Sequence, residues 1–413
     1  MIQLEGVYKI FGDRPKQALE LLERGRPKGE IYHETGQVIA VQDVSIALHE
    51  EELFVIMGLS GSGKSTLLRC INRLVEPTSG KCYLKSSEKM LEITALNQTA
   101  LRNLRRHQIS MVFQNFALLP NRTTLANVAL GLEAQGHTKK SRLETADRVL
   151  DLVGLSEWKN SYPHQLSGGM QQRVGLARAL ATEAKVLLMD EPFSALDPLI
   201  RYNMQELFME LQKRLKKTIF LVTHDLDEAL RLGGRIAIME EGRIVQVAGP
   251  EEIILNPRTA YVANFVKNAD PTGVLTIANI ALRVDADPAL VQRSDSAEKG
   301  EGAYIFKSGD REISVFTDDQ NRPVSARIND RHLSVEKMGE QNVDGFDNVF
   351  FSVCENIPIR EVMPLKVNSP FPIIVVSDKG AFTGIVTEKE ILQGLIKRGR
   401  FGESAGPGQK NHM

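Results

Sequence analysis

The chain has 413 residues and a formal net charge of −1, with 51 basic and 52 acidic side chains. Its 42% hydrophobic and 25% charged residues are typical of a soluble globular protein, and its length favours two or three domains. With this balance, no global electrostatic field recruits nucleic acid or anionic lipid.

Three further features limit where the protein works. No apolar run approaches the roughly 18 residues of a membrane-spanning helix, so a membrane role needs a partner subunit. The N-terminal residues lack the basic start and apolar stretch of a secretion signal. Cys70, Cys82 and Cys354 are too widely spaced for a metal site, which predicts free thiols in a reducing compartment.

In chain order, the first clear strand signal is the apolar run Leu53–Met57, which ends at Gly58. Similar runs follow at Lys185–Pro192, Thr218–Asp225 and Arg235–Ala248, with helical stretches between them. This alternation predicts an α/β fold with a mostly parallel sheet. Between about residues 109 and 181 apolar positions recur every three or four residues, which predicts a helical subdomain.

The composition changes after about residue 266. "KNADPTG" (Lys267–Gly273) has the composition of a linker, and the chain beyond Val274 is polar and rich in strand signals. We therefore expect a large α/β domain over residues 1–268, a small α+β appendage over 269–400, and a disordered tail over 401–413.

"GLSGSGKST" carries the pattern of a phosphate-binding loop, with two glycines four residues apart followed by Lys and Ser. It lies between a strand and a helix, a context that sets aside a chance glycine-rich turn. Glycines let backbone N–H groups surround an anion, and the helix N-terminus attracts negative charge. We expect Lys64 to reach the β- and γ-phosphates of ATP and Ser65 to ligate Mg²⁺. The predicted ATP-binding residues here are Gly58, Ser60, Gly61, Ser62, Gly63, Lys64, Ser65 and Thr66.

"VLLMDEP" places two carboxylates at the end of a central strand, where ligands of open α/β sheets bind. Asp190 is the expected Mg²⁺ partner, directly or through water. Glu191 is positioned to hold and polarise a water for in-line attack on the γ-phosphate. A solvated acidic pair is the alternative, and the phosphate loop makes it the weaker one.

"LSGGMQQR" adds a second anion-binding turn, because Ser167, Gly168 and Gly169 precede a helix. This motif resembles the signature of the ATP-binding cassette ATPases. Gln114 in "MVFQNFALLP" is similar to that family's glutamine loop, "SALD" (Ser194–Asp197) to its D-loop, and His224 in "VTHDLDEA" to its switch histidine. Together with the phosphate loop, five motifs stand in the family's order.

The resemblance implies a role for each motif. Two copies would pack head to tail, so that the signature of one chain caps the ATP of the other and Asp197 contacts the opposite phosphate loop. Gln114 would sense Mg²⁺ and the attacking water, and His224 would bind the γ-phosphate. An aromatic residue before the loop would stack on adenine; Phe11 is preferred over Tyr8, although either could belong to the core.

A narrower resemblance follows from the insertion over Asp13–Gln37, which most cassette ATPases lack. With "VFQNFALLPNRT" and "HQLSGGMQQRVGLARAL", it makes residues 1–268 similar to the ATPase subunits of glycine betaine/proline betaine importers. Kinship of this kind implies a peripheral protein at the cytoplasmic face of the cell membrane. Its partners would be a membrane permease and an extracytoplasmic solute-binding protein. Choline and carnitine remain alternative solutes.

The appendage resembles the paired cystathionine-β-synthase-type modules that members of this group carry. Ile357–Ile396 is similar to one such module, with a strand, a turn, a strand and a helix, and Arg311–Asp330 repeats part of it. Thr387 and Glu390 stand where the module holds ribose with a hydroxyl residue and an Asp. A regulatory sensor of a nucleotide or of ionic strength and an inert dimerisation element are equally compatible with this pattern.

Two functions outside transport fit these motifs less well. Cassette ATPases that act on DNA or the ribosome carry two cassettes or a long coiled coil, and this chain has neither. A nucleotide-binding regulator without turnover would not need both Glu191 and His224. Export is disfavoured because exporters commonly fuse the cassette to membrane helices.

Overall fold

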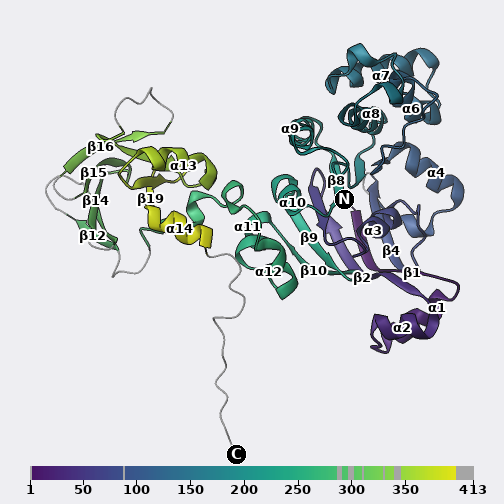
Figure 1. Cartoon of the computed structure of the whole chain (residues 1–413), viewed down its shortest axis with the longest axis horizontal. Coiled ribbons are helices and arrows are strands. Elements are labelled where there is room, and N and C mark those ends of the chain that lie inside the picture. Colours follow the sequence, from purple (N-terminus) through teal and green to yellow (C-terminus); the bar gives the residue numbers. More distant parts are fainter. Residues whose placement is uncertain are drawn as a thin grey trace, which may run out of the picture. The chain divides into compact units, whose positions relative to one another are not determined.

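A computed structural model describes residues 2–86, 89–285, 291–295, 302–308, 311–328, 331–338 and 346–396 (Figure 1). The chain divides into two compact units. The first comprises Met1–Ile253 and Arg258–Val262, and the second Ile254–Pro257 and Ala263–Met413. The tail expected over 401–413 lies outside the described residues.

The first unit is built on a six-stranded sheet in the order β10-β9-β3-β8-β7-β6. Its strands are β3 (Leu53–Met57), β6 (Ile109–Val112), β7 (Val186–Asp190), β8 (Thr218–Thr223), β9 (Arg235–Glu240) and β10 (Arg243–Ala248). All neighbours pair in parallel except β9 and β10, which form a hairpin. Every residue of β3, β7 and β8 is buried, as expected for strands covered on both faces. The predicted mostly parallel sheet is confirmed.

A second, antiparallel sheet in the order β2-β1-β4-β5 was not predicted. It consists of β1 (Ile2–Phe11), β2 (Val38–Leu48), β4 (Ser79–Ser86) and β5 (Lys89–Glu92). Its apolar side chains share one core with the parallel sheet, including Leu48, Phe54 and Phe220. The thiols of Cys70 and Cys82 are buried in that core, and burial raises the pKa of each to about 12, so both stay protonated.

The insertion forms two short helices, α1 (Pro15–Glu23) and α2 (Lys28–Thr35), between β1 and β2. Phe11 pairs with Val38 at the end of the β1–β2 ladder, so the insertion is an excursion from one strand end to the next. Ile10, Ala18, Leu22 and Ile31 make a small core of its own. Figure 1 shows α1 and α2 at the end of the first unit opposite to α6 and α7.

The remaining helices of the first unit cover the parallel sheet or form the region between β6 and β7. They are α3 (Lys64–Ile71), α4 (Gln98–His107), α5 (Thr124–Val128), α6 (Leu130–Gln135), α7 (Lys139–Leu152), α8 (Gly168–Ala181), α9 (Pro198–Leu215) and α10 (Leu226–Leu232). Next come α11 (Pro250–Leu255) and α12 (Ala260–Val266), whose residues are shared between the two units. Helices α5 to α8 pack on one another within the segment predicted to be helical, about 109–181, although its first residues form strand β6 instead.

The second unit contains a nine-stranded sheet in the order β11-β19-β18-β17-β16-β15-β14-β13-β12. Its strands are β11 (Leu282–Arg283), β12 (Val291–Asp295), β13 (Gly302–Ser308), β14 (Arg311–Thr317), β15 (Pro323–Ile328), β16 (Arg331–Lys337), β17 (Phe350–Cys354), β18 (Ile373–Val376) and β19 (Phe382–Val386). Two helices, α13 (Ile359–Asn368) and α14 (Glu388–Ile396), accompany them. Strands β12 to β16 form an antiparallel meander, whereas β16, β17 and β18 pair in parallel.

The internal repeat of the appendage extends over a hairpin and then stops. β18, a turn with Gly380 at φ 80, β19 and α14 follow the predicted order of strand, turn, strand and helix. The β14–β15 hairpin matches the first part, and its turn residue Asn321 accepts a 2.7 Å hydrogen bond from the Phe382 N–H. After β15 the next described element is strand β16, whereas β19 of the later module is followed by helix α14.

Candidate functional site

The predicted site residues gather at the carboxyl edge of the parallel sheet. The strand register sets Met57 beside Thr223, and Asp190 beside Val222. The phosphate loop, the acidic pair and His224 therefore leave neighbouring strands at the same level. Gln114 follows the adjacent strand β6 by two residues.

The phosphate loop needs glycine at both ends of its pattern. A Cβ on Gly58 would lie 2.2 Å from the carbonyl oxygen of Met239, and one on Gly63 would lie 2.1 Å from that of Ala40. Gly63 also has φ 100, in the region that favours glycine. Helix α3 begins at Lys64, and no described side chain caps it, so its first N–H groups are left to bind an anion.

The other loop residues surround this turn. Ser60 and Gly61 are exposed, whereas Ser65 and Thr66 are half-buried in the first turn of α3. The Ser62 hydroxyl is buried and has no hydrogen-bond partner among the described residues. A buried, unpaired hydroxyl in this loop suits a polar ligand.

Lys64 folds back over the loop. Its side chain donates hydrogen bonds of 2.8 and 2.9 Å to the carbonyl oxygens of Gly58 and Leu59, and the residue is only 3% exposed. Burial lowers the pKa of Lys64, while the carboxylates of Glu191 and Asp190 act in the opposite direction. The ammonium has three protons, so one remains to bind a phosphate oxygen.

Asp190 is the buried carboxylate of the site. It is 1% exposed, and its Oδ2 accepts a 2.8 Å hydrogen bond from Arg69 Nη2. Its Oδ1 is buried and has no partner among the described residues. One carboxylate oxygen and the Ser65 hydroxyl are the kind of ligands that Mg²⁺ takes together with substrate phosphates and water. Among the described residues, no cluster of three or more His, Cys, Asp or Glu side chains is suited to a metal.

The carboxylate of Glu191 is contacted by two of the other predicted site residues. Gln114 Nε2 donates to Glu191 Oε2 at 3.2 Å, and His224 Nδ1 lies 3.1 Å from the same oxygen. Glu191 has φ 46, which is uncommon for a residue with a side chain. A hydrogen bond of 3.0 Å from its N–H to the Val222 carbonyl holds that turn. Two side chains, each following another strand of the sheet, thus meet at the Glu191 carboxylate.

His224 is supported by a buried pair that the sequence analysis missed. Thr223, directly before it, donates a 2.6 Å hydrogen bond to Glu228 Oε2 and accepts one of 3.0 Å from the Asp225 N–H. Glu228 is 4% exposed, and burial raises its pKa to about 7. Its position on the inner face of α10, four residues after His224, is the signal that could have found it.

The signature residues lie apart from this group within one chain, and their described hydrogen bonds are local. Ser167 is the N-cap of α8 and accepts a 3.4 Å hydrogen bond from the Met170 N–H. Ser167 and Gly168 are exposed, whereas a Cβ on Gly169 would lie 2.5 Å from Ile200 Cγ2. Asp197, also exposed, caps α9 through the Ile200 N–H at 3.1 Å.

The two candidate aromatic residues differ in environment. Phe11 is 40% exposed and Lys9 Nζ lies 4.8 Å from its ring centroid. Tyr8 packs against the small core of the insertion. The exposed ring of Phe11 is therefore the one available to stack on a base.

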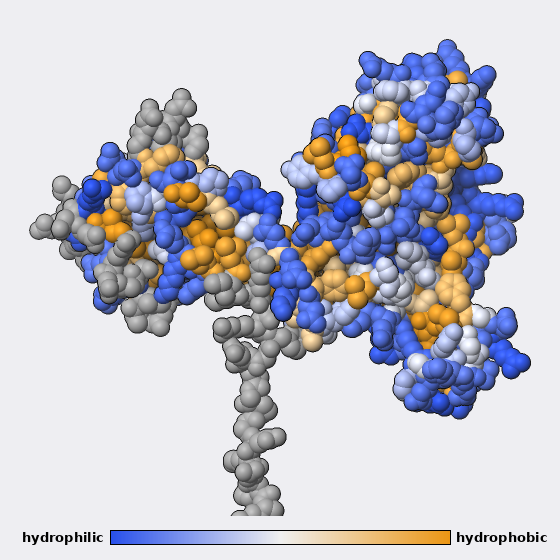
Figure 2. Space-filling model, in the orientation of Figure 1, coloured by the Kyte–Doolittle hydropathy of each residue, from blue (hydrophilic) through white to orange (hydrophobic). Residues whose placement is uncertain are grey.

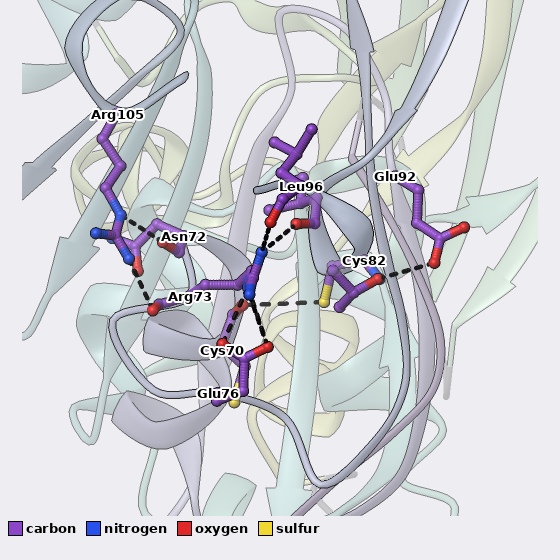
Figure 3. Close-up of polar contacts among 10 residues, drawn as sticks. Cys70, Asn72, Arg73, Glu76, Cys82, Glu92, Leu96 and Arg105 are labelled. Atoms are coloured by element: carbon purple, nitrogen blue, oxygen red, sulfur yellow. Dashed lines mark hydrogen bonds and ion pairs between the residues drawn. The ribbon is translucent and has the colours of Figure 1, made fainter. Parts of the chain in front are cut away.

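The far end of the phosphate-loop helix is fixed by two arginines (Figure 3). Arg105 of α4 donates to the carbonyl oxygens of Asn72 and Arg73 at 2.9 and 2.7 Å, directly after α3 ends. Arg73 in turn donates to the carbonyl oxygens of Ile93 and Leu96 at 3.1 and 2.7 Å. Cations at a helix C-terminus stabilise it, so this network holds α3 against the antiparallel sheet.

These features are those of an ATPase of the ATP-binding cassette class. A glycine loop joins a strand to a helix, Gln and His converge on an acidic pair, and a separate helix begins at a Ser–Gly turn. The family model of the ABC transporter matches residues 41–194. The chain is also similar to a solved structure, a dimeric post-hydrolysis state of the ATP-binding cassette MJ0796 bound to ADP and Pi. The similarity has a TM-score of 0.51 and 33% identity, and covers 60% of this chain and 99% of that one.

Curated relatives extend the similarity to nearly the full length. The glycine betaine/carnitine transport ATP-binding protein GbuA of Listeria monocytogenes is 43% identical, over 95% of this chain and 97% of that protein. The glycine betaine/proline betaine transport ATP-binding protein ProV of Escherichia coli is 39% identical, over 96% and 98%. The chain belongs to this family, the ATP-binding subunits of glycine betaine/proline betaine-type ABC transporters.

Within the described residues, no helix is long and apolar enough to cross a membrane.

Figure 2 shows mostly polar side chains on the visible face of the first unit over α6 and α7. Apolar surface appears at the position of α9, whose Leu199 is 70% exposed.

Proposed function

We propose that this chain hydrolyses MgATP to drive import of a quaternary ammonium compatible solute, of the glycine betaine type, through a separate membrane permease. The observation that carries the proposal is the convergence of Gln114 and His224 on Glu191, beside a phosphate loop with a buried lysine. A nucleotide-binding regulator would not need that arrangement. The convergence places a general base, Glu191, between a sensor of the metal, Gln114, and a donor for the γ-phosphate, His224.

Each polar group has a distinct task in hydrolysis. The N–H groups of the phosphate loop and Lys64 bind the phosphates, and Ser65 and Asp190 hold Mg²⁺. The metal, when bound, neutralises charge on the β- and γ-phosphates. Glu191 orients the attacking water through its carboxylate. In the structure, Gln114 and His224 both contact Oε2 of that carboxylate. Rotation of these two side chains toward ATP would leave Oε2 free to bind the water.

The ATP site is completed by a second copy of the chain. One chain carries one phosphate loop and one signature, and no hydrogen bond joins the two among the residues that the structure describes. Ser167 and Gly168 are exposed, as are Asp197 and the large apolar Leu199. An exposed anion-binding turn with an apolar neighbour suits burial against a partner, and a two-fold dimer would close two sites at once. The dimeric MJ0796 cassette is a precedent for such an assembly.

Glycine betaine is the proposed solute because it stands in the names of both relatives described above. Proline betaine and carnitine, each named for one of them, are the alternatives. Recognition of the cation would occur in other subunits, an extracytoplasmic binding protein and the permease. This chain would attach peripherally to the cytoplasmic face of the membrane through that permease.

The appendage over residues 269–400 is proposed to regulate transport rather than to turn over ATP. Glu390, at the position expected to hold ribose, instead accepts a 2.9 Å hydrogen bond from the Thr387 N–H and a second one from its hydroxyl. Both bonds cap α14, so this carboxylate is already used within its own module. Binding of a nucleotide there is therefore the less favoured interpretation, ionic strength is the signal we propose, and an inert dimerisation element is the alternative.

Uptake into proteoliposomes tests the proposal. Vesicles that contain the permease, the binding protein and this chain are loaded with MgATP, and uptake of labelled glycine betaine, proline betaine and carnitine is followed. We expect ATP-dependent uptake of glycine betaine that is lost with Glu191→Gln. Uptake of an unrelated solute alone, or none with an active ATPase, would contradict the substrate assignment.

A further inference from the structure

The ion pair between Arg69 and Asp190 has no role in the motifs described so far. Arg69 lies on α3, four residues after Ser65, so both side chains project from the same face of that helix. Helix α3 packs against β7, which ends at Asp190. The two proposed metal ligands, Ser65 and Asp190, thus come from elements that Arg69 joins.

The pair uses the carboxylate asymmetrically. Arg69 Nη2 donates to Asp190 Oδ2 at 2.8 Å, whereas Oδ1 is buried without a partner in the described part of the chain. The Asp190 side chain is 1% exposed, and that of Arg69 is 44% exposed. A single contact through one oxygen fixes the plane of the carboxylate and leaves the other oxygen available.

We propose that Arg69 is a positioning residue for the metal site: it holds Asp190 so that Oδ1 is directed to the Mg²⁺ of MgATP. This inference rests on the proposed ATPase function. Groups that hydrogen-bond to a metal-ligating carboxylate orient it, and their loss typically costs about 10–100-fold in metal affinity. The arginine also stabilises the buried charge of Asp190 before the metal arrives.

Two simpler explanations predict different results. If Arg69 only adds positive charge near the metal, its removal would strengthen binding of a divalent cation, because the repulsion is lost. If the pair only stabilises the fold, its removal would lower the melting temperature without a change in metal affinity. Only positioning predicts weaker metal binding when the charge is kept but the planar guanidinium is replaced.

The experiment measures Mn²⁺ bound to the full-length protein with a non-hydrolysable ATP analogue, by the loss of the free-Mn²⁺ signal in electron paramagnetic resonance. We expect Arg69→Met and Arg69→Lys each to weaken Mn²⁺ binding about tenfold. Affinity for the analogue in EDTA should stay unchanged. Arg102→Met, which removes an exposed charge from the neighbouring helix α4, is the matched control and should bind Mn²⁺ like the wild type.

Equal or tighter Mn²⁺ binding by both Arg69 variants would overturn the inference. Melting temperatures recorded alongside separate a folding defect from a metal defect, and Arg69→Lys covers the case in which Arg69→Met does not fold. Failure of the wild type itself to bind Mn²⁺ with the analogue would overturn the proposed function instead. The two failures are therefore distinguishable.

Discussion

Glu228 makes the stability of the first unit depend on pH in a direction opposite to that of most carboxylates. Its pKa rises from 4.5 to about 7 on folding, and burial is the main cause. Below pH 4.5 the carboxyl is protonated in both states and contributes nothing. Between pH 4.5 and 7 the unfolded chain releases the proton while the folded chain keeps it, so stability falls as the pH rises.

The full effect is present above pH 7, where it destabilises the folded unit by about 3 kcal/mol. Glu228→Gln removes the ionisable group and keeps a side-chain oxygen that accepts the hydrogen bond from the Thr223 hydroxyl. Relative to the wild type, we therefore expect the variant to gain about 2–3 kcal/mol of stability between pH 5 and pH 8.

The assay is urea unfolding at several pH values, followed by intrinsic tryptophan fluorescence. The chain has one tryptophan, Trp158, which lies in the first unit and reports on that unit alone. Glu144→Gln, at an exposed position of α7, controls for the loss of a negative charge. Parallel pH profiles for the wild type and Glu228→Gln would refute the reasoning.

Three further changes test the ATP site and the attachment of the insertion to the β9–β10 turn. Phe11→Ala should weaken ATP binding about tenfold in a fluorescent-nucleotide titration, since base stacking on an aromatic ring contributes about 1–3 kcal/mol; unchanged affinity would remove Phe11 from the site. Gly63→Ala should abolish nucleotide binding because its Cβ would meet the Ala40 carbonyl at 2.1 Å, whereas Gly25→Ala, with φ 80 but no neighbour within 4 Å, should bind ATP normally. Lys28→Met should lower the stability of the first unit by about 1 kcal/mol, because Lys28 bonds the Glu241 carbonyl in the β9–β10 turn; urea midpoints equal to the wild type's would contradict this.

The sequence was sufficient to predict the phosphate loop and the acidic pair because each is local. A short apolar run followed by glycines or carboxylates specifies both the strand and the groups at its end. The meeting of Gln114 and His224 at Glu191 could be expected once the strands were taken as parallel. Their order in the sheet, with β8 between β3 and β7, required the structure.

The antiparallel sheet was missed because its pairings are distant in the sequence. β1 pairs with β2 across the insertion and with β4 across the phosphate-loop helix. Alternation within one strand does not indicate its partner. Arg69, Arg73 and Arg105 were missed for the same reason, since each contacts backbone or side chains of another element.

The appendage shows the limit of a partial repeat. The similarity of Arg311–Asp330 to the later module correctly indicated the β14–β15 hairpin. Where the later module continues with α14, the earlier copy continues with strand β16. A hairpin is specified by its turn residues and its alternation, whereas the element that follows depends on what packs against it.

The central claim is that Glu191 activates water in a site shared by two chains. The most direct test is ATP turnover by the wild type and Glu191→Gln, with ATP-dependent dimerisation followed by size-exclusion chromatography. The account predicts that Glu191→Gln loses turnover by a factor of about 100 or more and that ATP traps it as a dimer. Equal turnover by both proteins as monomers would contradict it.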